Sequence, residues 1–295
     1  MFIVKYRKIF YAFTTLVMLF SVGAIFVYGV KFSIDFTGGT LSEFSYQKRP
    51  AKEQLIKELD KLQLGNYSLR EAGQNSFILR TQVLKLEKQK ALTNKLQSTG
   101  AKIDRYTDIG PTIGKELRAK AWIAIVLVVI AIILFIAFVF RHVSKPVSSW
   151  KYGLIAILAL IHDITIPFGV FAILGHTQGA EIDILFVMAL LAILGYSVND
   201  TIVIFDRVRE RLKENREGNR KESFEETVGN ALAQTMTRSI NTSLTTIITL
   251  LALYFVGAQV TQHFALVLLA GIIAGTYSSI ALAAPLLVSI KRFRK

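Results

Sequence analysis

The chain has 295 residues, of which 52% are hydrophobic, and its mean hydropathy is +0.45. A soluble globular protein of this length is rarely so apolar, so the composition excludes that class. The net charge of +14 and the pI near 9.9 are typical of nucleic-acid binding proteins, but membrane topology and lipid headgroups explain them more simply. We therefore predict no nucleic-acid partner. The chain has no cysteine, so no disulfide holds any part of it.

Six apolar segments are long enough to cross a bilayer, which takes about 20 helical residues. Spans 1 to 6 are predicted at 9–30, 119–140, 152–174, 184–205, 239–257 and 262–289. Basic residues precede span 1, lie between spans 2 and 3 (Arg141, Lys145, Lys151) and between spans 4 and 5, and follow span 6. The loops near 175–183 and 257–262 carry none. The positive-inside rule therefore predicts a multi-pass membrane protein with both termini in the cytoplasm.

Residues 31–118, between spans 1 and 2, are polar and long enough to fold, and the topology places them on the extracytoplasmic side. Alternating apolar residues predict strands at 32–36 and 44–46, a hairpin around Gln74 and Asn75, and a last strand at 101–109. Helical spacing predicts helices at 51–64 and 83–98. From the Gly38-Gly39 turn on, the resulting order is βαββαβ, which is typical of a small ferredoxin-like α+β domain.

The one long inner loop, 207–238, is predicted to be a cytoplasmic amphipathic connector. Ser223 and Glu226 fit a capping box, and apolar residues follow at helical spacing, which favours a helix at the membrane surface. A solvated connector helix is the plainer alternative. In span 6, the motif Gly271-x-x-x-Gly275 predicts close helix packing.

Four ionisable groups in or next to the spans need an explanation: Asp200, Arg238, Asp163 and His162. A charge within a span costs about 2.5–3.5 kcal/mol, so such groups usually face a protein interior or a water-filled cavity. Asp200 lies about 9 Å inside span 4, and Arg238 opens span 5 near the same surface, so we expect the two to form an ion pair that protonation of Asp200 would release.

His162 and Asp163 are adjacent in span 3, so we expect them to point in different directions, and either could line a proton path. The alternative is that all four ionisable groups only hold helices together, as nearby polar residues such as Asn199, Thr242 and Thr245 could also do.

The sequence contains no nucleotide-binding loop, no metal-ligand spacing among its four histidines and no serine-centred elbow motif. We therefore predict that the protein is not an enzyme and uses no cofactor or metal. A proton gradient is then the remaining energy source, and Asp200 is its expected acceptor.

Three motifs carry a resemblance: IDFTGGT at 34–40, GYSVNDTIVIFDRVRE at 195–210 and RSINTSLTT at 238–246. Together with the order of spans, they resemble the SecF branch of the SecD/SecF family of protein-export membrane subunits, in the resistance–nodulation–division superfamily. The resemblance covers the whole chain. It implies a bacterial plasma-membrane subunit that uses the proton-motive force to complete preprotein export.

The partners that the resemblance implies are SecD, the SecYEG channel, YajC, the translocating preprotein and membrane lipids. It assigns the proton pathway to Asp200 and Arg238, with His162 and Asp163 at matching positions and the polar residues after Arg238 as weaker matches. Two alternatives stay open. One is a scaffold subunit that carries no protons, and the other is a small-molecule exporter, for which a single external domain of about 80 residues is small.

Overall fold

The structure is a computed structural model that describes residues 2–140, 148–218, 222–257 and 259–292. Arg141, Lys145 and part of the predicted connector, 219–221, lie outside the described residues. The chain forms two compact units, each with its own core. The membrane unit comprises residues up to 31, 124–180 and those from 185 on. The sheet unit comprises 32–123 and 181–184.

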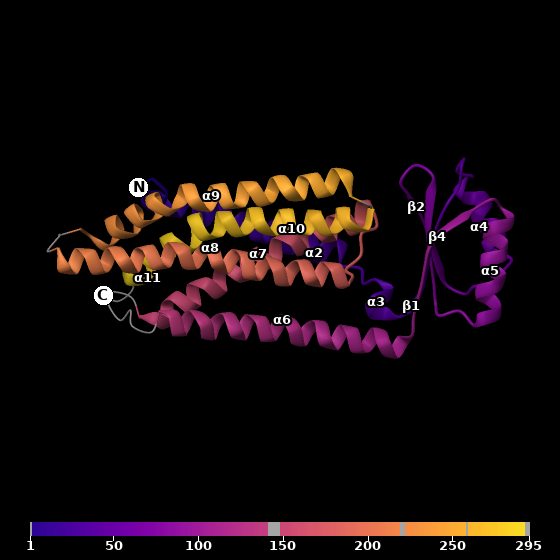
Figure 1. The fold of residues 1–295 in the computed structure, drawn as a ribbon, viewed down its shortest axis with the longest axis horizontal. Helices are drawn as coiled ribbons and strands as arrows, with labels where there is room; N and C mark the ends of the chain where they lie inside the picture. Colours follow the sequence, from indigo (N-terminus) through magenta and orange to yellow (C-terminus); the bar gives the residue numbers. More distant parts are fainter. Residues whose placement is uncertain (1, 141–147, 219–221, 258, 293–295) are drawn as a thin grey trace. The chain divides into compact units, whose positions relative to one another are not determined.

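Within the described residues, six helices are long and apolar enough to cross a membrane, which confirms the predicted number (Figure 1). After the short α1 (Phe2–Lys5), they are α2 (Arg7–Tyr28), α6 (Pro111–Val139), α7 (Ser149–Thr177), α8 (Ile184–Glu217), α9 (Phe224–Val256) and a last span built of α10 (Gln259–Ser278), the π-helical turn η1 (Ser279–Ala283) and α11 (Ala284–Arg292). The helices extend beyond the apolar segments because backbone hydrogen bonding continues past the end of the hydrophobic run.

Small residues allow close helix packing in the membrane unit. A Cβ atom on Gly271 of α10 would lie 2.2 Å from the Ile193 side chain of α8, and one on Gly275 would lie 2.9 Å from Ser197 Cβ. The prediction that the Gly271 and Gly275 motif packs helices together is therefore confirmed. Gly169 of α7 makes the same kind of approach to Ser21 of α2, with its Cβ position 2.7 Å from the Ser21 Cα.

The predicted connector 207–238 is not a separate element, which corrects the prediction. Its first part continues α8 to Glu217, and its second part begins α9 at Phe224. The capping box is confirmed, because the Glu226 N–H donates to Ser223 Oγ at 3.2 Å and the Ser223 N–H donates to Glu226 Oε2 at 2.8 Å. The apolar face of this segment is buried against the protein rather than laid on a membrane surface; its members are Phe224, Val228, Ala231 and Leu232.

The sheet unit has the order β1 (Gly39–Ser45), α4 (Lys52–Asp60), β2 (Tyr67–Ala72), β3 (Ser76–Thr81), α5 (Leu86–Ser98) and β4 (Lys102–Ile109). The strands form one antiparallel sheet in the order β2-β3-β1-β4. This is the ferredoxin-like arrangement, so the predicted α+β fold is confirmed. Both helices cover one face of the sheet (Figure 1), where Phe44, Phe77 and Leu79 are fully buried.

The strand predicted at 32–36 is wrong. Residues Ile34–Thr37 form the single helical turn α3, which Ser33 caps by accepting a hydrogen bond from the Asp35 N–H at 3.1 Å. Ser and Asp side chains of this kind compete with strand pairing, and they outweigh the short apolar alternation here. The first strand starts only after the turn, at Gly39.

Gly38 and Gly39 occupy positions that exclude a side chain, because their φ angles are positive and because backbone atoms lie close by. Their φ angles are +75° and +139°. A Cβ on Gly38 would lie 2.8 Å from the Pro111 Cα, and one on Gly39 would lie 2.7 Å from the Thr81 carbonyl oxygen. Both obstacles are backbone atoms of neighbouring elements, so they cannot move aside as a side chain could. The glycine pair lets the start of β1 pass between the start of α6 and the end of β3.

We expect Gly38→Ala to destabilise the sheet unit by about 3 kcal/mol, because it combines strain at positive φ with a backbone clash. The matched control is Gly100→Ala, since Gly100 has φ +84° but nothing within 4 Å of its Cβ position. The control is expected to cost about 1 kcal/mol. Amide hydrogen exchange of the β1 residues measures both changes. Equal protection in the two variants would show that the positive φ angle, and not the backbone clash, requires the glycine at position 38.

Candidate functional site

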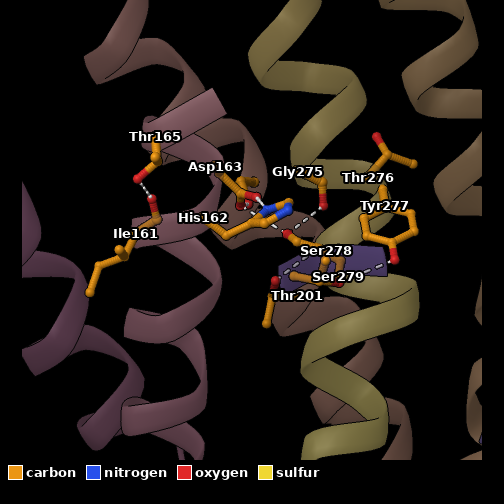
Figure 2. Close-up of polar contacts among 12 residues, drawn as sticks. Ile161, His162, Asp163, Thr165, Thr201, Gly275, Thr276, Tyr277, Ser278 and Ser279 are labelled. Atoms are coloured by element: carbon orange, nitrogen blue, oxygen red, sulfur yellow. Dashed lines mark hydrogen bonds and ion pairs between the residues drawn. The ribbon is translucent and has the colours of Figure 1, made fainter. Parts of the chain in front are cut away.

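A buried carboxylate and imidazole pair lies at the centre of the membrane unit. Asp163 is 0% exposed and His162 is 2% exposed, and the His162 Nδ1 lies 2.8 Å from the Asp163 Oδ1. The two side chains therefore meet, which corrects the expectation that adjacent helical residues point apart. Figure 2 shows both side chains directed from α7 toward the last span. We call this pair the His162–Asp163 dyad.

Hydroxyl groups from two other helices complete the surroundings of the dyad. The Asp163 Oδ2 accepts hydrogen bonds from the Ser278 hydroxyl of α10, at 2.9 Å, and from the Ser197 hydroxyl of α8. One residue further along, Ser279 lies 2.8 Å from the Thr201 hydroxyl of α8 (Figure 2). Asp163 thus joins α7 to α8 and α10, and both of its oxygens have polar partners.

The π-helical turn explains why two consecutive serines both point inward. Neighbouring residues of an α-helix point about 100° apart, and a π turn inserts one extra residue, which changes the helix phase at that point. Ser278 and Ser279 are both 0% exposed, on either side of the junction between α10 and η1. Sequence reasoning missed them; the signal that it could have used is the polar run Tyr277, Ser278 and Ser279 inside an apolar span.

A second polar face of α8 is directed toward α9. The Ser239 hydroxyl donates to the Asp200 Oδ1, whereas the Asp200 Oδ2 is buried without a hydrogen-bond partner among the described residues. One turn earlier, the Tyr196 hydroxyl donates to Ser243 at 3.3 Å. Residues four apart share a helix face, so α8 presents Tyr196 and Asp200 to α9. It presents a different pair, Ser197 and Thr201, to α7 and to the last span.

Arg238 is not paired with Asp200, which corrects the expected ion pair. The Arg238 side chain is exposed in the single chain, and the ion pairs of the described residues include none between it and Asp200. The supporting residues Asn199, Thr242 and Thr245 are exposed as well. The Thr242 hydroxyl donates to the Arg238 carbonyl at 2.9 Å, so it bonds its own helix rather than Asp200. Arg238, Thr242, Thr245 and Thr249 form one exposed polar stripe on α9.

The sheet unit contains a third cluster, which sequence reasoning missed. Glu181, 8% exposed at its side chain, contacts Arg80 of β3 and lies 3.7 Å from the Arg70 guanidinium of β2. Burial and the neighbouring charge of Arg70 lower the pKa of Arg80 to about 10, so this guanidinium is still charged at neutral pH. A lone glutamate in a short loop gives no local signal for such a contact.

The residues around Glu181 are also tied down through the backbone. The Ser33 N–H donates to the Ile182 carbonyl at 2.8 Å, and the Ile184 N–H donates to the Asp35 carboxylate at 3.1 Å. Residues 181–184 connect α7 to α8 along the chain, and they fold as part of the sheet unit. We call residues 181–184 the docked loop.

The fold and the buried polar groups define a class: a multi-pass membrane protein with ionisable residues inside its helical bundle and one folded α+β unit between its first two spans. Intramembrane carboxylates of this kind are typical of ion-coupled membrane proteins. Sequence comparison gives the family. The family described as the C-terminal part of the protein export membrane proteins SecD and SecF matches residues 88–293, and the SecD/SecF GG motif matches residues 23–48, which include Gly38 and Gly39.

Individual relatives agree with the family match. Protein translocase subunit SecF of Thermobaculum terrenum is 40% identical over 97% of this chain and 93% of its own length. Protein translocase subunit SecDF of Thermus thermophilus is 34% identical over 96% of this chain, which corresponds to 37% of that longer protein. The crystal structure of SecDF, a translocon-associated membrane protein from Thermus thermophilus, superposes with a TM-score of 0.85 at 32% identity, over 98% of this chain and 38% of that one. The chain belongs to the SecD/SecF family of protein-export membrane proteins.

Proposed function

We propose that this chain is a subunit of the accessory complex of the bacterial Sec preprotein translocase, and that it uses the proton-motive force together with a SecD chain to complete protein export. Asp200, Arg238, Asp163 and His162 form its proton pathway, with Asn199, Thr242 and Thr245 as supporting polar residues. The complex lies in the bacterial plasma membrane, with both termini in the cytoplasm. Its further partners are the SecYEG channel, YajC, the preprotein and the surrounding lipids.

The observation that carries this proposal is the state of Asp200. Its carboxylate lies within an apolar span, accepts a hydrogen bond from Ser239 on one oxygen and has no hydrogen-bond partner on the other among the described side chains. An ionised carboxylate with a buried bare oxygen is costly, whereas a protonated one is much less so. A group in this position changes its surroundings when it takes up or loses a proton, which is what coupling to a gradient requires.

The exposed polar stripe on α9 supports a partner within the membrane. Arg238 and the threonines after it would face hydrocarbon if this chain stood alone, and an arginine there is unfavourable by several kcal/mol. A SecD chain with polar groups of its own would cover the stripe and bring an anionic or hydrogen-bonding partner to Arg238. The SecDF relative, in which one longer chain contains the region that matches this protein, supports SecD as that partner.

We expect Asp200→Asn to abolish the stimulation of preprotein export by an imposed proton gradient, because the amide keeps the size of the side chain but cannot exchange the proton. The measurement follows late-stage translocation into vesicles that contain the chain, SecD and the channel, with and without the gradient. Asp206→Asn is the matched control, since Asp206 is exposed on the same helix and its ion pair among the described residues is with Arg209 at 3.4 Å. The control is expected to respond like the wild type.

One set of observations favours a second candidate, a scaffold that stabilises SecD and the channel without carrying protons. Hydroxyl groups tie helices together at several places, such as Ser243 with Thr276 at 2.6 Å and Thr14 with Tyr277 at 3.1 Å. Such bonds hold transmembrane helices together in any membrane protein. If Asp200→Asn and Asp163→Asn both assemble normally and still respond to the gradient, the scaffold function is the correct one for this chain.

A further inference from the structure

We propose that the proton-accepting atom of span 3 is the Nε2 of His162, and that Asp163 acts as a counter-ion that stays ionised. The proposal rests on the proposed function and deepens it, because it assigns the proton to one atom of the His162–Asp163 dyad. Ser197 and Ser278 are then positioning residues, which act through Asp163.

The hydrogen bonds around Asp163 decide where the dyad carries its protons. The Asp163 Oδ2 accepts from two hydroxyl groups, those of Ser197 and Ser278. Hydrogen bonds that a carboxylate accepts stabilise its ionised form, so the two hydroxyl donors favour an ionised Asp163. The remaining oxygen, Oδ1, lies 2.8 Å from the His162 Nδ1. With Asp163 ionised, the Nδ1 is the donor in this contact, so the neutral ring carries its proton on Nδ1.

The same argument leaves Nε2 bare. In a neutral imidazole one nitrogen carries the proton and the other has a free lone pair. The His162 Nε2 is buried and has no hydrogen-bond partner within the described part of the chain, on a side chain that is 2% exposed. Buried polar atoms are nearly always paired, so an unpaired acceptor next to a carboxylate needs a functional explanation. A proton that arrives at Nε2 supplies one.

When Nε2 takes up a proton, no other proton in the dyad needs to move. The ring goes from neutral to +1, both ring nitrogens then carry hydrogens, and the new charge lies beside the carboxylate of Asp163. Loss of the proton from Nε2 returns the neutral Nδ1–H form. A direct hydrogen bond between imidazolium and carboxylate is of the strong, charge-assisted kind.

Among the described residues, the groups around the dyad bring no competing charge. From α10, the titratable side chain is that of Tyr277, whose ring centroid lies 6.1 Å from that of His162 and whose hydroxyl is bonded to Thr14 of α2. From α8, the dyad meets the hydroxyl of Ser197. In the described parts of the chain, no ion pair brings a lysine or arginine to Asp163. The charged form of His162 would thus be balanced by Asp163 alone.

Protonation also has a mechanical consequence. It creates an N–H donor at a buried point where the neutral ring has no partner, and an unpaired buried donor is unfavourable. The protonated state therefore favours any arrangement of α7, α2 and α10 that brings an acceptor to Nε2. This gives the proton on span 3 a way to change helix packing that is separate from Asp200, which bonds α9.

The test is ¹⁵N NMR of histidine-labelled chain, co-assembled with SecD in lipid vesicles, because the ¹⁵N shifts of an imidazole report which nitrogen is protonated. The His162 signals are assigned by their loss in His162→Gln, which separates them from the other three histidines. At mildly alkaline pH we expect the Nδ1–H form with a bare Nε2. On acidification, we expect both nitrogens to be protonated while Nδ1 stays hydrogen-bonded.

Two results would overturn the proposal. One is a neutral ring with its proton on Nε2, which would mean that Asp163 donates to Nδ1 and carries the proton itself. The other is a ring that stays neutral on acidification while a protonated carboxyl band, absent from Asp163→Asn, appears in the infrared spectrum. Neither result depends on export, so failure here and failure of the proposed function can be told apart by the response of Asp200→Asn to the gradient.

Ser278 variants test the positioning residues. Ser278→Ala removes one donor from Asp163 and is expected to lower the ratio of the Nδ1–H form to the Nε2–H form on the order of tenfold, since hydrogen bonds to charged groups are the stronger ones. Ser278→Thr keeps the hydroxyl and is expected to restore the wild-type ratio. An unchanged ratio in Ser278→Ala would show that this serine only packs helices. Ser289→Ala is the control, because Ser289 bonds Tyr11 rather than the dyad.

Discussion

Asp163→Leu is expected to lower the stability of the membrane unit by about 3–5 kcal/mol and to abolish gradient-driven export. Leucine has the same number and branching of side-chain heavy atoms as aspartate, so no cavity forms and the loss comes from hydrogen bonding. The change leaves the imidazole of His162 and two hydroxyl groups without their common acceptor, all in a region that is 0–2% exposed. Removing one partner of a buried charged pair costs about this much, because the partner left behind remains buried.

Two further variants test whether the effect is specific to the buried carboxylate of Asp163. Asp163→Asn keeps an oxygen that can accept one serine hydroxyl, so we expect a smaller loss of stability and still no gradient response. Asp206→Leu removes a carboxylate that is exposed on α8, and it is expected to change stability by less than about 0.5 kcal/mol. Stability is measured by thermal unfolding in lipid or detergent, together with assembly with SecD. Wild-type stability in Asp163→Leu would show that the cluster does not hold α7, α8 and α10 together.

Glu181→Gln is expected to release the docked loop from the rest of the sheet unit. The neutral amide removes the negative charge that contacts the half-buried Arg80 and lies 3.7 Å from Arg70. We expect a local loss of about 3 kcal/mol, which corresponds to hydrogen exchange on the order of 100-fold faster at the amides that hold the loop. Those amides are the Ser33 N–H, bonded to Ile182, and the Ile184 N–H, bonded to Asp35.

Glu71→Gln is the matched control for this variant. Glu71 pairs with Arg49 at 2.9 Å, but its side chain is 46% exposed, and exposed pairs contribute less than about 1 kcal/mol. The exchange of Ser33 and Ile184 should therefore stay at the wild-type rate. The docked loop connects the helices that carry Asp163 and Asp200, so Glu181→Gln should also weaken gradient-stimulated export. Fast exchange with full stimulation would show that the docking is purely structural.

The elements that depend on local patterns could be predicted from the sequence. Length and apolarity give the six spans, and alternation between Gly38-Gly39 and Gly110-Pro111 gives the βαββαβ order. The capping box at Ser223 is a contact between residues three apart, and the Gly271 and Gly275 motif needs only a neighbouring helix. In each case the pattern that predicts the feature lies within a short stretch of the chain.

The features that could not be predicted depend on which helices become neighbours. Asp200 meets Ser239 rather than Arg238, because the helix phase of α9 turns Ser239 inward and leaves Arg238 exposed. Glu181 finds its arginines on two strands more than a hundred residues earlier in the chain. The contact between His162 and Asp163 depends on side-chain rotamers, which residue spacing does not specify.

The π turn at Ser279–Ala283 divides the last span into two helical segments that are out of phase with each other. A single 3.6-residue wheel drawn through both segments would assign the wrong side chains to the interior on one side of Ser279. The π turn thus has the effect of a one-residue insertion in the helix. It lies next to the serines that bond Asp163 and Thr201. Deleting one residue there would leave the span long and apolar enough to cross the membrane, yet it would rotate either Gly275 and Ser278 or Leu287 away from their partners.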